Sequence, residues 1–297
     1  MKRPLAHRII DRIWSEAGDR LQDPVRPPEA SGDPSEVSSV SSTMEWPRAC
    51  AALAAGTWTS HGFRRRKSVR QVVETLAPSD GRHFAKWIAS HHPEFLNDPR
   101  VRAANDWGDP IQAPSRVLGT TRAWSPTSLR YLAHALWLVD SGFIHAGGTA
   151  VEIGVGFGGL SAMLAICHGV STAMVDLQEV ERAAALQMAE LELAAHAKPN
   201  KLPEADFCLI SNYAFTELPS ELQDAYIDRY LRHAQSGVIL SNARVFSGRI
   251  GGRSDEQLVG ILQAAGVPAE IGRNPAILGP ADRSCGVSLI HWNHAHS

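Results

Sequence analysis

The chain has 297 residues, of which 44% are hydrophobic and 20% are charged, with a formal net charge of −2. This composition is typical of a globular protein large enough for one sizeable domain and an accessory region. The near-neutral charge excludes a general attraction to nucleic acid or to membrane surfaces, and no apolar run approaches the roughly 20 residues of a membrane span. We therefore expect a small-molecule partner, with no nucleic acid and no membrane.

The start of the chain and the cysteines predict a cytoplasmic protein. Met1 to Pro4 is not followed by the apolar core of a secretory signal. The cysteines are scattered, form no C-x-x-C pair and are typical of buried thiols in a reducing compartment. These are Cys50, Cys167, Cys208 and Cys285.

The first part of the chain is expected to be an arm and a flexible linker, over residues 1–45. Residues 5–18 carry apolar positions at helical spacing. From residue 23 to 43 the composition shifts to Pro, Ser, Gly and acidic residues, which bury too little apolar surface to offset the entropy of ordering.

Residues 46–145 predict a helical lid or accessory region. The basic run from Arg64 to Lys67 is interpreted as a solvated face or a helix end in preference to an anion site. Residues 104–110 are rich in turn formers, which predicts a loop that carries Asp106. Ser125 and Pro126 then begin a helix, with a cap followed by proline in the first turn.

The most informative stretch is the glycine turn after residue 153. Residues 149–153 predict a buried strand, Gly154, Gly156, Gly158 and Gly159 turn the chain, and a helical pattern follows directly. Asp176 ends the next apolar run, 20 residues after Gly156, where a carboxylate can accept both hydroxyls of an adenosine ribose. The pattern indicates an adenosine-containing ligand but does not separate a nicotinamide dinucleotide from S-adenosylmethionine.

Strand and helix patterns alternate after Asp176, which predicts a parallel, doubly wound sheet. A helix is expected from Glu181 to His196. Ala205 follows Asp176 by only 29 positions, so the third strand is expected to be short or to lack a following helix. The remaining expected strands cover residues 205–212, 237–242, 269–278 and 286–292.

Several of these segments together resemble class I S-adenosylmethionine-dependent methyltransferases, and more narrowly the sugar O-methyltransferase family. The resemblance covers roughly residues 95–245. Its specific part is the segment Ser211-Asn212-Tyr213-Ala214-Phe215-Thr216-Glu217-Leu218. It implies a Rossmann-like seven-stranded methyltransferase sheet over residues 146–297, with a helical N-terminal region that serves as a lid or as the contact of a homodimer.

The resemblance also implies roles for residues by position. Glu152, Gly154, Gly156 and Gly158 would hold the methionine end of S-adenosylmethionine, and Asp176 its ribose. Leu177 would lie beside the adenine, and Ser211 and Asn212 would border the sulfonium and the acceptor. The shortened segment before Ala205 departs from the family pattern, so no adenine contact is assigned there.

Methyl transfer to an alcohol needs a group that removes the hydroxyl proton, either a general base or a metal that acidifies the hydroxyl. Glu217 is the first candidate for the base, with a charge at a helix N-terminus as the alternative reading. Tyr213 is a candidate for orienting the acceptor and Asp106 a second candidate base, although a turn residue is the more common role for Asp106. Arg130 and Tyr131 are candidates for the cofactor carboxylate, against ordinary helix packing. The histidines, including His294 and His296 near the C-terminus, form no clear metal cluster, so no metal ligand is assigned and Mg²⁺ stays open.

The sequence thus predicts a cytoplasmic methyltransferase that modifies a hydroxyl of a sugar or a sugar-containing natural product. An amine acceptor is the nearest alternative, because a neutral amine needs less help from a base. A nicotinamide-dependent reductase is less favoured, since no separate catalytic domain follows the sheet. A non-catalytic partner is disfavoured by the intact glycines and Asp176.

Overall fold

The structure is a computed structural model that describes residues 45–198, 200–272, 274 and 277–294. The expected helix over residues 5–18 and the expected linker over 23–43 lie outside the described residues. Within them, no helix is both long and apolar enough to span a bilayer.

The centre of the molecule is a seven-stranded sheet with the order β3-β2-β1-β4-β5-β7-β6. Neighbouring strands are parallel, except that β7 runs antiparallel to both β5 and β6. This arrangement confirms the predicted Rossmann-like methyltransferase sheet. The strands are β1 (Thr149–Ile153), β2 (Ser171–Val175), β3 (Ala197–Lys198), β4 (Cys208–Asn212), β5 (Ser236–Ser241), β6 (Glu270–Gly272) and β7 (Ser288–Asn293).

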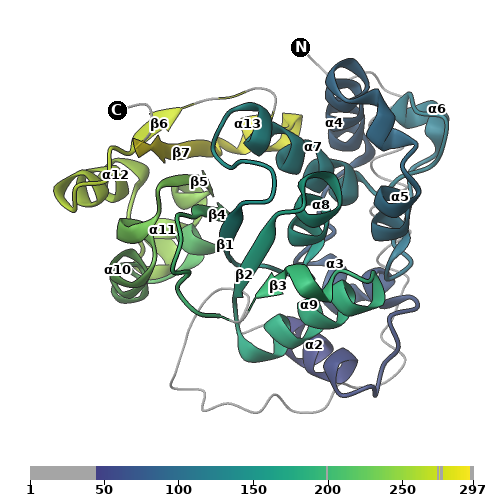
Figure 1. Cartoon of the computed structure of the whole chain (residues 1–297), viewed down its shortest axis with the longest axis horizontal. Helices are drawn as coiled ribbons and strands as arrows, with labels where there is room; N and C mark the ends of the chain where they lie inside the picture. Colours follow the sequence, from purple (N-terminus) through teal and green to yellow (C-terminus); the bar gives the residue numbers. More distant parts are fainter. Residues whose placement is uncertain (1–44, 199, 273, 275–276, 295–297) are drawn as a thin grey trace.

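Helices lie on both sides of this sheet (Figure 1). Those before β1 are α2 (Trp46–Ala54), α3 (Lys67–Arg70), α4 (Pro78–His91), α5 (Pro99–Asp106), α6 (Ser115–Leu118) and α7 (Pro126–Asp140). Those after β1 are α8 (Gly159–His168), α9 (Gln178–Glu190), α10 (Ser220–Arg229), α11 (Ala243–Ile250), α12 (Asp255–Ala264) and α13 (Pro280–Cys285). Short 3-10 turns connect several of them: η2 (Phe63–Arg65), η3 (Pro93–Leu96), η4 (Ala194–His196), η5 (Ala214–Glu217) and η6 (Leu231–His233).

Each face of the sheet has its own hydrophobic core, because successive side chains of a strand point to opposite faces. In β4, Cys208 and Ile210 pack with α7, α8 and α9, whereas Leu209 packs with α10 and α12. Both cores are built from strands buried on both faces, as expected for a sheet covered by helices on each side.

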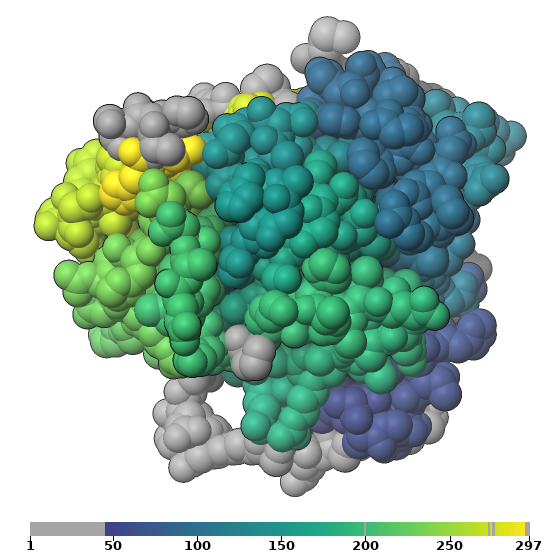
Figure 2. Space-filling view, in the orientation of Figure 1, coloured from purple at the N-terminus to yellow at the C-terminus, as the bar shows by residue number. Residues whose placement is uncertain are grey.

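The helices before β1 belong to the first of these cores. In α2, α4 and α5, buried residues such as Leu53, Phe84 and Val101 share one cluster with Leu164 of α8. In the space-filling view these helices and the α8–α9 layer form one continuous surface (Figure 2). The N-terminal helices are therefore an integral layer over the sheet, and they reach the edge where its glycine turn lies.

The short third strand is confirmed. β3 has two residues, and among the described residues between it and β4 there is no helix. The helix expected from Glu181 to His196 instead begins at Gln178 and ends at Glu190. Glu192, with a φ of 61°, takes a left-handed conformation that α-helix cannot continue.

Candidate functional site

A cavity of about 240 Å³ lies where the carboxyl ends of β1, β2 and β4 meet. In this order β1 has β2 on one side and β4 on the other, and such switch points are where open α/β sheets bind ligands. The predicted site residues that line it are Arg130, Tyr131, Glu152, Gly154, Gly156, Asp176, Leu177, Asn212, Tyr213 and Glu217.

The glycine turn brings the backbone against this cavity. Gly154 has a φ of 79°, and a Cβ there would lie 2.0 Å from the Cβ of Ala214. Gly156, with a φ of 57°, donates its amide to Asp176 Oδ2 at 3.3 Å. Gly158 is buried at the N-cap of α8, behind the turn and outside the lining, where a Cβ would lie 2.8 Å from Gln187 Oε1. Its predicted contact with the cofactor is therefore replaced by a structural role.

Glu152, the penultimate residue of β1, lines the cavity and is only 2% exposed. Burial raises its pKa from 4.5 to about 8, against the opposing effect of Ser161 Oγ, which donates to Glu152 Oε2 at 2.5 Å. A buried carboxylate without a cation beside it favours the protonated form. The position is thus suited to a positively charged ligand group.

Asp176 follows β2 and faces the same cavity. Burial raises its pKa from 3.8 to about 7, while the amides of Leu177 and Gly156 lower it. Leu177 donates its amide to Asp176 Oδ1 at 2.8 Å, which fixes the carboxylate at the turn. Two acidic groups from the neighbouring strand ends of β1 and β2 therefore face one cavity, each held by hydrogen bonds from neighbouring residues.

Of the two residues predicted at the tip of β4, only Asn212 lines the cavity. Ser211 is fully buried, donates to the Ile153 carbonyl at 3.0 Å and accepts from the Phe215 amide at 3.1 Å. Both hydrogen bonds tie β4 to β1 and to η5. The expectation that Ser211 borders the ligand is corrected to a role in holding the strand end.

Asn212 is oriented by His134 of α7, which the sequence did not reveal. His134 Nε2 lies 3.0 Å from the Ile277 carbonyl, which only accepts, so Nε2 carries the proton and Nδ1 is an acceptor. Nδ1 lies 3.5 Å from Asn212 Nδ2. Burial lowers the pKa of His134 to about 3, so this tautomer persists across the physiological range.

Tyr213 and Arg130 also line the cavity. Tyr213 has a φ of 74°, rare for a residue with a side chain and often found at functional sites. Its hydroxyl donates to Asp282 Oδ1 at 2.8 Å and lies 3.5 Å from Arg130 Nη1. Burial alone lowers the pKa of Arg130, but Tyr213, Tyr131 and Asp282 together raise it. Arg130 therefore stays charged, and its buried Nε has no hydrogen-bond partner among the described residues.

Glu217, the last residue of η5, also lines the cavity. Burial raises its pKa, and Asn242 Nδ2 donates to Glu217 Oε1 at 2.6 Å. Asn242 Oδ1 in turn accepts from Thr216 Oγ1 at 2.7 Å. The second carboxylate oxygen of Glu217 is left for a ligand, and a raised pKa brings this group closer to that of an effective base at neutral pH.

Asp106 is not on a loop and lines neither this cavity nor the larger one beside it. It ends α5, is exposed, and accepts from Arg102 Nε at 2.9 Å and from Gln112 Nε2 at 2.6 Å. The residue is a helix-end anchor, which corrects its assignment as a second candidate base.

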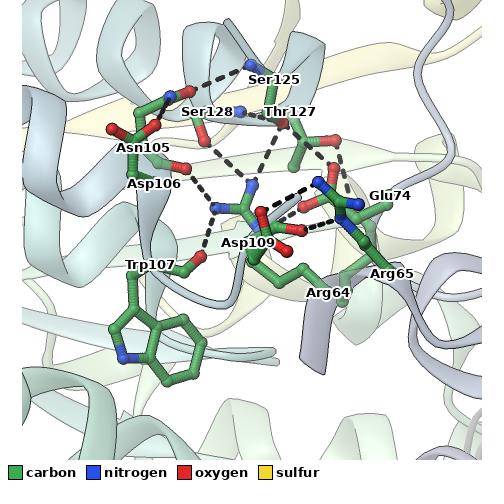
Figure 3. A network of polar contacts seen from close by, with 11 residues as sticks. Arg64, Arg65, Glu74, Asn105, Asp106, Trp107, Asp109, Ser125, Thr127 and Ser128 are labelled. Atoms are coloured by element: carbon green, nitrogen blue, oxygen red, sulfur yellow. Dashed lines mark hydrogen bonds and ion pairs between the residues drawn. The ribbon is translucent and has the colours of Figure 1, made fainter. Parts of the chain in front are cut away.

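The basic run from Arg64 to Lys67 is not simply a solvated face. Arg64 is fully buried, and its guanidinium is surrounded by acceptors from three separate stretches of the chain (Figure 3). These contacts are to Glu74 Oε1 at 2.5 Å, the Asn105 carbonyl at 2.9 Å, the Trp107 carbonyl at 3.2 Å, Ser125 Oγ at 3.1 Å and Ser128 Oγ at 2.9 Å. Its Cζ also lies 4.5 Å from the ring centroid of Phe157, inside the glycine turn. Arg64 thus joins the N-terminal helices to the ligand cavity.

The N-terminal region also contributes directly to the lining. Trp46 of α2, with Val72 and Val73 after α3, covers the cavity opposite the sheet. The predicted helical cover was visible in the sequence as helical periodicity, but nothing there indicated which side chains reach the ligand. Asp282 and Asn242 were missed for the same reason, since they come from elements far along the chain.

Metal binding has no support among the side chains that the structure describes. Within them, no group of three or more His, Cys, Asp or Glu residues could hold a metal ion. His291 lies in β7 beside Glu270, and His296 falls outside the described residues. Cys50 and Cys208 are buried and Cys167 is half-buried, but Cys285 is exposed, so the expectation of a buried thiol is wrong for Cys285.

A scan against protein-family models and a search of curated proteins found no match. Solved structures with a similar chain course include an O-methyltransferase family protein from Burkholderia thailandensis (11% identity, 57% of this chain, 58% of that chain, TM-score 0.40). Another is an O-methyltransferase from neocarzinostatin biosynthesis in complex with S-adenosylmethionine (18% identity, 57% of each chain, TM-score 0.38). A third is mitomycin 7-O-methyltransferase (17% identity, 74% of each chain, TM-score 0.40). The first two are matched over less than two thirds of their own length.

Proposed function

We propose that this chain is an S-adenosylmethionine-dependent methyltransferase that acts on a hydroxyl of a sugar or a sugar-containing small molecule. The observation that carries this proposal is one cavity in which a glycine turn and two buried acidic groups, Glu152 and Asp176, face the same space. Such a cavity matches a ligand with a cation at one end and vicinal hydroxyls at the other. The resemblance of residues 211–218 to sugar O-methyltransferases favours the sugar-bearing acceptor.

Each end of the cofactor has a partner of suitable chemistry. The methionine ammonium would lie by Glu152, where a cation lowers the raised pKa of that carboxyl and so favours its charged form. The methionine carboxylate would pair with Arg130, whose buried Nε is available. The ribose hydroxyls would donate to Asp176, and Leu177 would lie against the adenine.

The bound cofactor supplies an activated methyl group, and the protein supplies alignment, a dry site and a proton acceptor. Trp46 and Val72 cover the cavity and keep water from it. Glu217 accepts the proton of the acceptor hydroxyl on the carboxylate oxygen that Asn242 does not hold. Tyr213, fixed by Asp282, forms the adjoining wall and orients the acceptor.

Calorimetric titration with S-adenosylmethionine, S-adenosylhomocysteine and NADH tests this proposal, with Asp176→Ala as control. We expect micromolar binding of the first two ligands and its loss in the variant. Binding of NADH alone would overturn the methyltransferase assignment in favour of a reductase. Binding of none of the three would point to a non-catalytic partner.

A further inference from the structure

A second cavity, of about 480 Å³, adjoins the first and shares Val72, Arg130, Tyr213 and Glu217 with it. We infer, building on the proposed function, that this acceptor chamber binds a molecule in which an apolar aromatic ring adjoins the reacting hydroxyl. A sugar that carries an aryl group fits this description, whereas a bare sugar does not.

The charged groups of the acceptor chamber are gathered at its inner end. Glu217 and Arg130 lie where the two cavities meet. Asp282 accepts from the Tyr213 hydroxyl, and Asn242 donates to Glu217, so much of the hydrogen-bonding capacity of these residues is already used within the protein. The free carboxylate oxygen of Glu217 therefore marks the place of the reacting hydroxyl.

Apolar side chains from three separate segments form much of the remaining wall, beside the polar residues Gln71 and Thr75. The apolar residues are Val72 and Leu76 before α4, Val245 and Phe246 of α11, and Val287 before β7. Val245 is 38% exposed, a high value for a valine that faces a concave surface. Apolar side chains held open to solvent around a cavity indicate a partner with an apolar surface.

The chemistry of this wall discriminates between acceptors. A bare sugar carries hydroxyls around its ring, and those that face an apolar wall lose hydrogen bonds to water without replacement. An aromatic ring in the same place gains free energy as its surface leaves water. The wall thus favours a ring beyond the hydroxyl, while the polar inner end accepts the hydroxyl itself.

The reaction that this placement serves is transfer of the methyl group from sulfur to the acceptor oxygen. The acceptor oxygen forms a bond to the methyl carbon as the sulfur–methyl bond breaks and its electron pair returns to sulfur. The hydroxyl proton passes to the carboxylate of Glu217 and later leaves to solvent. The products are the methyl ether and neutral S-adenosylhomocysteine.

Two glycosides that differ only in the group beyond the sugar test the inference. Phenyl β-glucoside and methyl β-glucoside would each be titrated into protein saturated with S-adenosylhomocysteine, with phenol as a ring without sugar. We expect the phenyl compound to bind at least about tenfold more tightly than the methyl compound, as burial of an aromatic ring provides.

Two variants test whether the acceptor chamber causes the difference in affinity between the two glucosides. Phe246→Ala should reduce the preference for the phenyl compound severalfold, while affinity for S-adenosylhomocysteine stays unchanged, since Phe246 does not line the cofactor cavity. Ile271→Ala is the matched control, because Ile271 is 43% exposed in β6 and lines neither cavity. It should leave the preference intact.

The outcomes separate this inference from the proposed function. Equal or tighter binding of methyl β-glucoside, or failure of every aryl compound to bind the loaded protein, overturns the inference and leaves the methyltransferase proposal standing. Failure of S-adenosylhomocysteine itself to bind overturns the proposed function. Tighter binding of phenol than of either glycoside would support an aromatic ring in the acceptor. It would also indicate that the reacting hydroxyl is carried by the ring and not by the sugar.

Discussion

The two cavities of this protein meet at Glu217 and Arg130 but are built differently. The first cavity lies at the ends of β1, β2 and β4, where Gly154 and Gly156 let the chain turn against Ala214 and Val73 without a Cβ in between. The acceptor chamber is formed by side chains of short segments, among them α11 and α13, that meet only in the folded chain.

This difference has consequences for how each cavity responds to change. The strand ends have little freedom to adapt, because a single carbon atom added at Gly154 would overlap Ala214. A cavity made of side chains on short helices can be reshaped by substitution while the sheet stays intact. The first should therefore set the reaction class, and the second the acceptor.

The largest effect is expected from Gly154→Ala. The new Cβ would overlap that of Ala214, and the φ of 79° disfavours any side chain. We expect no measurable binding of S-adenosylhomocysteine by calorimetry, together with a melting temperature well below that of the wild type. Gly169→Ala is the matched control, since Gly169 has a φ of 66° and nothing within 4 Å of a Cβ. If both variants bind equally weakly, backbone strain and not the overlap is responsible.

The next largest effect is expected at the border of the cavities, in Glu217→Gln. Loss of a general base typically reduces turnover about 10²- to 10⁴-fold. Affinity for S-adenosylhomocysteine should stay within a factor of about two, because the amide has the size of the carboxyl group. Single-turnover kinetics with an aryl glycoside measure the chemical step directly. Unchanged turnover would remove Glu217 as the base and favour an amine acceptor.

A third prediction concerns the joint between the N-terminal helices and the glycine turn. Arg64→Ala removes a buried cation, leaving Glu74 without its ion-pair partner and the carbonyls of Asn105 and Trp107 without this donor (Figure 3). Breaking a buried ion pair in this way costs about 3–5 kcal/mol of unfolding free energy. Arg65→Ala is the control, because the Arg65–Asp109 pair is solvent-exposed and such pairs contribute about 0–1 kcal/mol. Similar urea midpoints for the two variants would contradict this account.

The sequence predicted best what depends on neighbouring residues. The glycine turn, the acidic residues near the ends of β1 and β2, and the shortened third strand all follow from local spacing, because backbone geometry and strand ends are local properties. The Arg64 network and the acceptor chamber could not be predicted in this way. A basic run is usually solvated, and only the folded chain brings Glu74, Asn105 and Ser128 around Arg64.

The errors have the same cause. Ser211 and Asp106 were assigned to the site because polar residues beside a strand end or in a turn-rich segment often contact ligands. In the structure, Ser211 satisfies the backbone of β1 and η5, and Asp106 holds Arg102 and Gln112. Whether a polar side chain faces a ligand or a neighbouring backbone is decided by packing, and no local pattern encodes it.

The smallest effect is expected from pH, and it sharpens the role of the cofactor cavity. Ribose hydroxyls donate most strongly to an ionised carboxylate, and the pKa of Asp176 is raised by burial to about 7. Affinity for S-adenosylhomocysteine should therefore rise with pH up to about 7, by at most about tenfold per pH unit. Above this pH, Asp176 is ionised and should cause no further increase in affinity. Asp176→Asn should bind more weakly and lose this part of the dependence.

The same pKa shift fixes the sign of a stability effect in the ligand-free protein. The folded state holds the Asp176 proton more tightly than the unfolded chain, in which the pKa of this group is near 3.8. The contribution of the Asp176 carboxyl group to the free energy of unfolding is therefore fully present below pH 4. That contribution is lost as pH rises to about 7, so Asp176→Asn should flatten the decline of unfolding free energy across this window. Urea unfolding at pH 5, 6, 7 and 8 measures it. An unaltered slope in the variant would mean that the carboxyl group is solvated, and the cavity would then be open to water at its ribose end.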